Sequence, residues 1–331
     1  MESEEKTPGP ASPKAGSLGE QCAAIWRSIP HARLFLLLFG SWVVLFHFLG
    51  NSTLGYVNTP SLFGWWQWTN SRTPEEAHTV FVPLVSAFLL WHRRQDFQAI
   101  ESRIWWPGIV VLLAGIAFHV IGYTIQQTRV SVVGFIGGIY GIGAVLWGPR
   151  WMRAALIPVV LLGFCVPLGS AAEPLTFPLR LLATDIGAAV CRTGLGIDVI
   201  QQGNLLLDAA GAYRYEVAAA CSGIQSLTAV LALALIYAGL NGMSIFRTGL
   251  LVAAGIPLAI VANVARLLMI VMAAEVYGQS AGDYVHRSGI LSLVPYIPAI
   301  AGLLFVGRLL KGRGGPDVES TTGNRLGEVP G

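Results

Sequence analysis

The longest apolar stretch of the sequence covers residues 247–276 and reads RTGLLVAAGIPLAIVANVARLLMIVMAAEV. A helix needs about 20 mostly apolar residues to cross the hydrocarbon layer of a membrane. Inside that layer, only helices and closed barrels satisfy their own backbone hydrogen bonds. The stretch is long enough to span and carries a basic residue, Arg266, well inside it. It therefore predicts a membrane-spanning helix with a charged side chain in its interior.

The composition of the whole chain agrees with a membrane protein. Of its 331 residues, 54% are hydrophobic and only 12% are charged, whereas soluble domains carry about 25% charged residues. The net charge of +3 is too small to indicate a nucleic-acid-binding protein. The four cysteines have no CxxC spacing, so the sequence indicates neither a metal site nor a disulfide framework, and it gives no sign of a cofactor.

Seven further apolar stretches are candidate spans. They cover residues 33–50, 79–92, 104–124, 130–148, 153–170, 219–240 and 288–309. We therefore expect an all-α polytopic membrane protein with about eight transmembrane helices. The membrane domain would occupy residues 33–311, between polar, disordered cytoplasmic tails at 1–32 and 312–331.

The segment between the fifth and sixth spans has a different pattern. Residues 174–197 carry Arg180, Asp185 and Arg192 at roughly helical intervals, which predicts an amphipathic helix at the membrane interface. A ninth span is the alternative interpretation. Residues 198–218 then hold three short strand-like runs separated by glycine-containing breaks, which predict a small β-ribbon on the outer membrane surface.

The distribution of basic residues predicts the orientation. Short cytoplasmic loops are enriched in lysine and arginine, and residues 91–94 and 148–153 each contain two arginines. Both loops are inside if both termini are cytoplasmic. The start of the sixth span and the loop before the last span then face outward, which is the periplasmic side in a bacterial inner membrane.

Cys221 is the first candidate for chemistry, in the run Ala219-Ala-Cys-Ser-Gly-Ile-Gln. It lies in the expected first turn of the sixth span, where free backbone N–H groups and the helix dipole favour a thiolate. Ser222 and Gly223 would let a substrate backbone approach, and Gln225 follows one turn later. Most membrane cysteines are simply small apolar residues, and we give Cys22, Cys165 and Cys191 that interpretation.

Arg266 is the second candidate, because a charge inside a span is costly and usually faces a polar cavity. Asn263 lies one turn before it and can orient the guanidinium. Cys221 and Arg266 are equally distant from the middle of the connecting loop at 241–246. In an antiparallel helical hairpin they would therefore lie at the same height. His286, just before the last span, would reach the same region and exchange protons near neutral pH.

These residues resemble a known family. The order Cys221-Ser-Gly-Ile, then Asn263-x-x-Arg266, then His286 before a final span resembles the exosortase/archaeosortase family, with specific similarity over about residues 216–286. The chain departs from the family at Ala219, where an acidic residue is common, and at Gln225, where arginine is common. Both departures bear on the substrate motif and subfamily.

The resemblance implies a membrane-embedded cysteine peptidase or transpeptidase. Its partners would be membrane-anchored proteins carrying a C-terminal sorting signal, made of a short motif such as Pro-Glu-Pro, a transmembrane helix and a basic tail. A cell-surface acceptor could receive the cleaved protein. The resemblance assigns Cys221, Arg266 and His286 to the catalytic positions. From the residues alone, two alternatives stay open: a transporter or export component using Arg266 as an anion site, and a non-catalytic membrane scaffold.

Overall fold

The computed structural model describes residues 19, 29–72, 79–168, 173–209, 211, 214–216, 224–288 and 290–311. Each of the eight stretches expected to span the membrane carries a helix. The first four are α2 (Ala32–Leu49), α4 (Val82–His92), α6 (Gly108–Thr124) and α7 (Thr128–Trp147). The other four are α8 (Pro149–Leu162), α10 (Ile224–Leu240), α11 (Ile245–Tyr277) and α13 (Tyr296–Lys311). The tails at 1–18 and 312–331 lie outside the described residues.

Three of these helices are long and apolar enough to cross a membrane, namely α2, α7 and α11. The helices α4, α6 and the Leu227–Leu240 part of α10 are apolar but shorter. The chain is therefore a helical membrane protein, and the number of eight spans stays a prediction. Four further helices lie between these: α3 (Leu62–Arg72), α5 (Arg94–Ala99), α9 (Glu173–Val190) and α12 (Gln279–Arg287).

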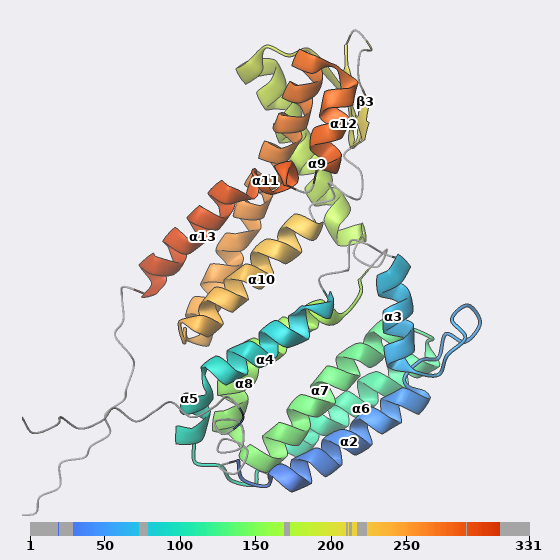
Figure 1. The fold of residues 1–331 in the computed structure, drawn as a ribbon, viewed down its shortest axis with the longest axis vertical. Coiled ribbons are helices and arrows are strands. Elements are labelled where there is room, and N and C mark those ends of the chain that lie inside the picture. Colours follow the sequence, from blue (N-terminus) through green and yellow to red (C-terminus); the bar gives the residue numbers. More distant parts are fainter. Residues whose placement is uncertain are drawn as a thin grey trace, which may run out of the picture.

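The N-terminal part of the molecule contains α6 and α7 as a close antiparallel pair beside α2 (Figure 1). Glycines allow the close approach. A Cβ atom on Gly115 would lie 2.7 Å from the backbone nitrogen of Gly138, and one on Gly122 would lie 2.7 Å from that of Ser131. Because van der Waals packing drives helix association in lipid, small residues at the contact are a common solution.

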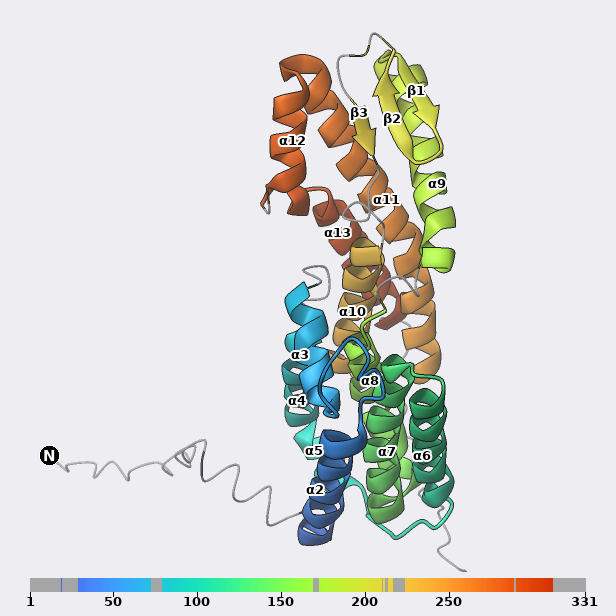
Figure 2. The same cartoon turned by 90° about the vertical axis from the view of Figure 1, so that its right-hand side faces the viewer.

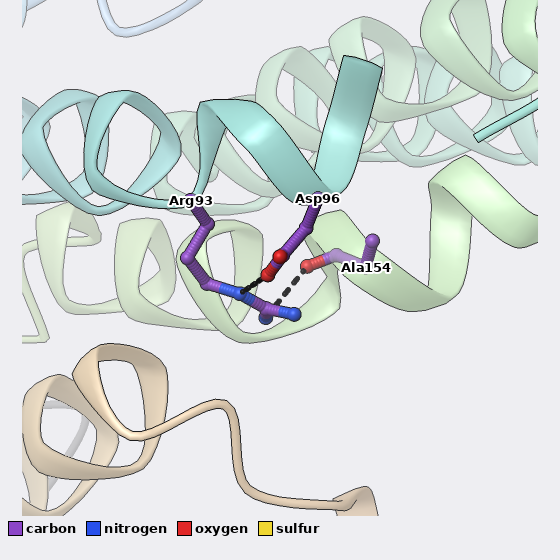
Figure 3. A network of polar contacts seen from close by, with 3 residues as sticks. All are labelled: Arg93, Asp96 and Ala154. Carbon is purple, nitrogen blue, oxygen red and sulfur yellow. Dashed lines mark hydrogen bonds and ion pairs between the residues drawn. The ribbon is translucent and has the colours of Figure 1, made fainter. Parts of the chain in front are cut away.

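The two arginine-bearing loops lie together at one end of the bundle, and Figure 3 shows the contacts by which Arg93 of the first loop reaches α8, just after the second loop. The Nε atom of Arg93 donates a hydrogen bond to Asp96, at 2.9 Å, and Nη1 donates one to the carbonyl of Ala154, at 3.5 Å. The turn between α10 and α11 is at the same end, because Gly239 contacts Leu89 near the C-terminus of α4. The orientation proposed from the sequence requires these loops to share one side, and they do.

The end of α13 also returns to this side. The Nζ atom of Lys311 donates a hydrogen bond to Oδ1 of Asn241, in the turn between α10 and α11, at 2.9 Å. The other ends of α10, α11 and α13 consequently point the opposite way. At that opposite end, a cap of extra structure covers the bundle (Figures 1 and 2).

The cap is built on the C-terminal half of α11. This helix has 33 residues, so it is about 50 Å long, whereas the hydrocarbon layer is only about 30 Å thick. Its last turns pack with α9, β1 and β2 in one cluster of buried residues. The members are Ala188, Cys191, Val199, Leu206, Leu267, Ile270, Val271 and Ala274. One face of α11 after Arg266 therefore buries against protein.

The predicted β-ribbon is confirmed as a three-stranded antiparallel sheet in the order β1-β2-β3. The strands are β1 (Val199–Gln202), β2 (Leu205–Asp208) and β3 (Arg214–Glu216). Val199 pairs with Asp208, and Leu205 pairs with Glu216. The tight turn between β1 and β2 uses Gly203 at φ 62°, a conformation that glycine adopts without strain.

The segment predicted to be an interfacial helix is α9, followed by a π-helical turn at Cys191–Leu195. It points in the same direction as α11 and packs on its flank (Figure 2). The two helices touch at Gly187, where a Cβ atom would lie 2.7 Å from Cδ2 of Leu267. A side-chain hydrogen bond from Gln201 to Asp185 ties α9 to the sheet. Protein contacts thus hold α9 on the bundle.

Candidate active site

Arg266 lies on α11 at the base of the cap. From the first residue of α11 to Arg266 the helix is about 32 Å long, close to the thickness of the hydrocarbon layer. The residue is only 7% exposed, and Asn263, one turn earlier on the same face, is 4% exposed. Protein therefore encloses both polar side chains.

His286 is brought to Arg266 by a reversal of the chain. After α11 ends, Gly278 adopts φ 85°, and α12 folds back onto the C-terminal half of α11. Val285, next to His286, packs against the buried cluster of the cap. The reversal places the half-buried His286 within electrostatic range of Arg266.

The surroundings of His286 shift its protonation equilibrium. Burial lowers the pKa of the imidazole, and the positive charge of Arg266 lowers it further. Asp283 raises the pKa and Arg287 lowers it. Both burial and a nearby cation disfavour the imidazolium form. The imidazole is therefore poised to be neutral near pH 7, which is the form that accepts a proton.

The remaining candidate residues on the sixth predicted span precede α10 in the sequence or lie in its first turn. Cys221, Ser222 and Gly223 lie outside the described residues, and Gln225 is in the first turn of α10. The described part of the α10–α11 hairpin fixes its alignment, because Gly255 contacts Val230 and Leu231. An antiparallel alignment that puts Cys221 and Arg266 at the same height along the helix axes would require nearly the same contact. The observed contact differs from it by about two residues, or 3 Å along the helix.

A comparison with protein families was made for the whole chain. The family model described as transmembrane exosortase (Exosortase_EpsH) matches residues 65–305. The chain belongs to the transmembrane exosortase family. The resemblance inferred from the sequence is thereby confirmed at the level of the family. No curated protein and no solved structure matches this exosortase.

The match covers most of the bundle and the cap of this exosortase. It begins at Trp65 in α3 and ends within α13, so it includes α10, α11, α12 and the sheet. Arg266 and His286, and the sequence position of Cys221, are all inside the matched region.

Two other cysteines of the exosortase are described and are buried. Cys165 donates a hydrogen bond to the carbonyl of Thr79, at 3.7 Å. Burial raises the pKa of the Cys191 thiol, and Glu275 raises it further, against the opposing effect of Arg192. A raised pKa reduces the thiolate fraction. Both positions fit the structural interpretation made from the sequence.

The burial of Arg180 differs from what the sequence predicted. The sequence placed Arg180 on the polar face of an amphipathic helix, but the residue is only 7% exposed in the structure. The signal that could have revealed this burial is small residues on the same helical face, Ala183, Gly187 and Ala188, which let α9 approach α11 closely. A periodic pattern of charges does not show which face meets protein.

Proposed function

We propose that this exosortase is a cysteine peptidase or transpeptidase that removes C-terminal sorting signals from membrane-anchored proteins. Cys221 is the nucleophile, Arg266 stabilises negative charge, and His286 transfers protons. Ser222, Gly223, Gln225 and Asn263 contact or orient the substrate. The site faces the periplasm of a bacterial inner membrane, and the exosortase needs no metal or cofactor.

The proposed reaction balances its protons through His286. The neutral imidazole takes the proton of the Cys221 thiol, and the thiolate attacks the substrate carbonyl to form a tetrahedral oxyanion. Arg266 stabilises this oxyanion, whose charge is poorly solvated in a protein-enclosed site. The imidazolium then donates its proton to the leaving amine as the C–N bond breaks, which leaves a thioester. An amine or water, deprotonated by His286, next attacks the thioester and regenerates the thiol.

The observation that carries this proposal is the electrostatic proximity of Arg266 and His286. The two residues come from different helices and are within electrostatic range because α12 folds back on α11. Buried groups with perturbed pKa values cluster at functional sites. The contact of Gly255 with Val230 and Leu231 supports the alignment of the sixth and seventh spans that the proposal assumes.

The decisive experiment uses a reporter with an exported domain, the sequence Pro-Glu-Pro, an apolar helix and a basic tail. The reporter is co-expressed with the full-length exosortase, and its C-terminus is determined by mass spectrometry. Cleavage by the wild type that is lost in Cys221→Ala, and retained in Cys22→Ala, is expected. Equal cleavage by Cys221→Ala and wild type would refute the nucleophile. A loss of anion flux in Arg266 variants without any cleavage would favour the transporter alternative.

A further inference from the structure

Arg180 is a second buried guanidinium near the candidate site, and nothing in the proposed chemistry uses it. Its side chain is 8% exposed, and among the residues that the structure describes its Nε atom has no hydrogen-bond partner. In the described part of the chain, its one ion pair is with Glu173, at 3.9 Å. Glu173 is itself 59% exposed, and exposed ion pairs of this length contribute little stability.

Arg180 and Arg266 are on two helices, α9 and α11, that pack against each other. Arg180 is about two turns, or 10 Å, before Gly187 on α9. Gly187 contacts Leu267, which directly follows Arg266. The N-terminal end of α9 is close to the start of α10 in both views (Figures 1 and 2). Arg180 and Arg266 are therefore held on neighbouring helices around the region where α10 begins.

A poorly paired buried guanidinium is costly. Removing a charge from water costs several kcal/mol unless a partner compensates, and a charged residue at membrane depth is a candidate functional group for that reason. Arginine presents a rigid fork of N–H donors that matches a carboxylate or phosphate in two hydrogen bonds. The ligand that best compensates Arg180 is therefore a planar or tetrahedral anion.

We propose that Arg180 binds an acidic side chain of the substrate segment, and so determines specificity for a carboxylate beside the cleaved bond. This inference rests on the proposed function. An extended peptide rises about 3.3 Å per residue, so the offset of about 10 Å along α9 between Arg180 and the level of Arg266 places the acidic residue at least about three positions from the bond held at Arg266. The main alternative source of the anion is a lipid phosphate.

The test measures binding, in lipid nanodiscs, of the uncleaved reporter to the Cys221→Ala exosortase. In a series of reporters, a single glutamate is placed at successive positions beside the apolar helix, each with a matched glutamine version. With Arg180 present, the glutamate reporter should bind at least tenfold tighter than its glutamine version at one position. Arg180→Gln should abolish that preference, and Arg180→Lys should restore part of it.

Several outcomes would overturn the inference. A glutamate preference that persists in Arg180→Gln would show that another group reads the carboxylate. Equal weakening of both reporters would show a structural role for Arg180. Loss of the preference in Glu173→Gln would show that the ion pair is what matters. An anionic lipid that co-purifies with the wild type and is lost in Arg180→Gln, with no effect on reporter preference, would assign the site to lipid.

Because the assay uses binding to a variant lacking Cys221, it is independent of the nucleophile. If cleavage in the preceding experiment proves not to depend on Cys221 while the glutamate preference still requires Arg180, the proposed chemistry fails and the binding role stands. If cleavage depends on Cys221 and no preference is found, the binding role fails alone.

Discussion

The guanidinium of Arg266, on α11, is close enough to the imidazole of His286, on α12, to lower the pKa of that imidazole. The relationship exists because Gly278 reverses the chain and α12 packs back on α11. It gives one residue a permanent positive charge and the other a readily exchanged proton within one enclosed site. This combination suits the stabilisation of an anion coupled to proton transfer.

The acidic limb of the pH profile of cleavage should shift in opposite directions when either of two charged residues near His286 is replaced. If the reaction needs the neutral imidazole, activity falls as the pH drops through the pKa of His286. Arg287→Gln removes a charge that lowers this pKa, so activity should be lost at a higher pH than in the wild type. Asp283→Asn removes a charge that raises it, so activity should persist to lower pH.

The measurement for these two variants is kcat/KM for reporter cleavage as a function of pH. Protein yield and monodispersity in detergent serve as folding controls. Shifts of both variants in the same direction, or no shift in either, would contradict the assignment of the acidic limb to His286.

Replacement of Arg266 by lysine should separate the effect of the positive charge on turnover from the effect of the planar guanidinium geometry. Arg266→Lys keeps the positive charge near His286, so the acidic limb of the pH profile should stay in place. The planar set of N–H donors is lost, and turnover should fall about 100-fold, as for removal of one oxyanion donor. Wild-type turnover in this variant would show that only charge matters. Arg94→Lys, at the opposite end of the bundle, is the matched control and should be neutral.

The cysteines should differ in reactivity toward N-ethylmaleimide at pH 7. A Cys221 thiolate favoured by Arg266 should be alkylated at least ten times faster than Cys191, whose pKa burial raises. Mass spectrometry of peptides from the intact membrane protein gives both rates. In Arg266→Gln the reaction at Cys221 should slow while that at Cys191 is unchanged. Equal rates for the two thiols in the wild type would argue against an activated nucleophile.

The contact between α6 and α7 should tolerate no added methyl group at its closest point. Gly115→Ala would place a Cβ atom 2.7 Å from a backbone nitrogen of α7, so the helices must separate, at a cost of about 1–3 kcal/mol. Gly137→Ala on the facing helix meets its nearest atom at 3.9 Å and should change stability by less than about 1 kcal/mol. Thermal unfolding in detergent compares the two, and equal midpoints would contradict the packing.

Some features of the cap were accessible from the sequence because they depend on local patterns. The alternation and glycine breaks after Asp198 predicted three strands, and the structure has them at Val199–Gln202, Leu205–Asp208 and Arg214–Glu216. The positions of the glycines allowed the turns, and strand pairing followed from their short spacing. The number of spans was less accessible, since the helix in the second apolar stretch, α4, has only 11 residues.

Other features depend on contacts between distant segments. The sequence placed Arg266 in the interior of a span because apolar residues flank it on both sides. In the structure four residues after it, Leu267, Ile270, Val271 and Ala274, pack against α9 and the sheet, because α11 is longer than the hydrocarbon layer is thick. Hydropathy measures the transfer of a segment out of water and does not distinguish lipid from protein as the new environment.

The sequence by itself determined that this protein is a helical membrane protein with a cysteine, an arginine and a histidine in the order of the exosortase family. Those conclusions rest on composition and on short motifs, which are properties of the linear sequence and need no contact between distant segments. Only the tertiary structure brought His286 within electrostatic range of Arg266 and buried Arg180 on α9, because α12 must fold back and Gly187 must let α9 reach Leu267. Such close approaches depend on side-chain packing between helices, which no periodic pattern within one helix specifies.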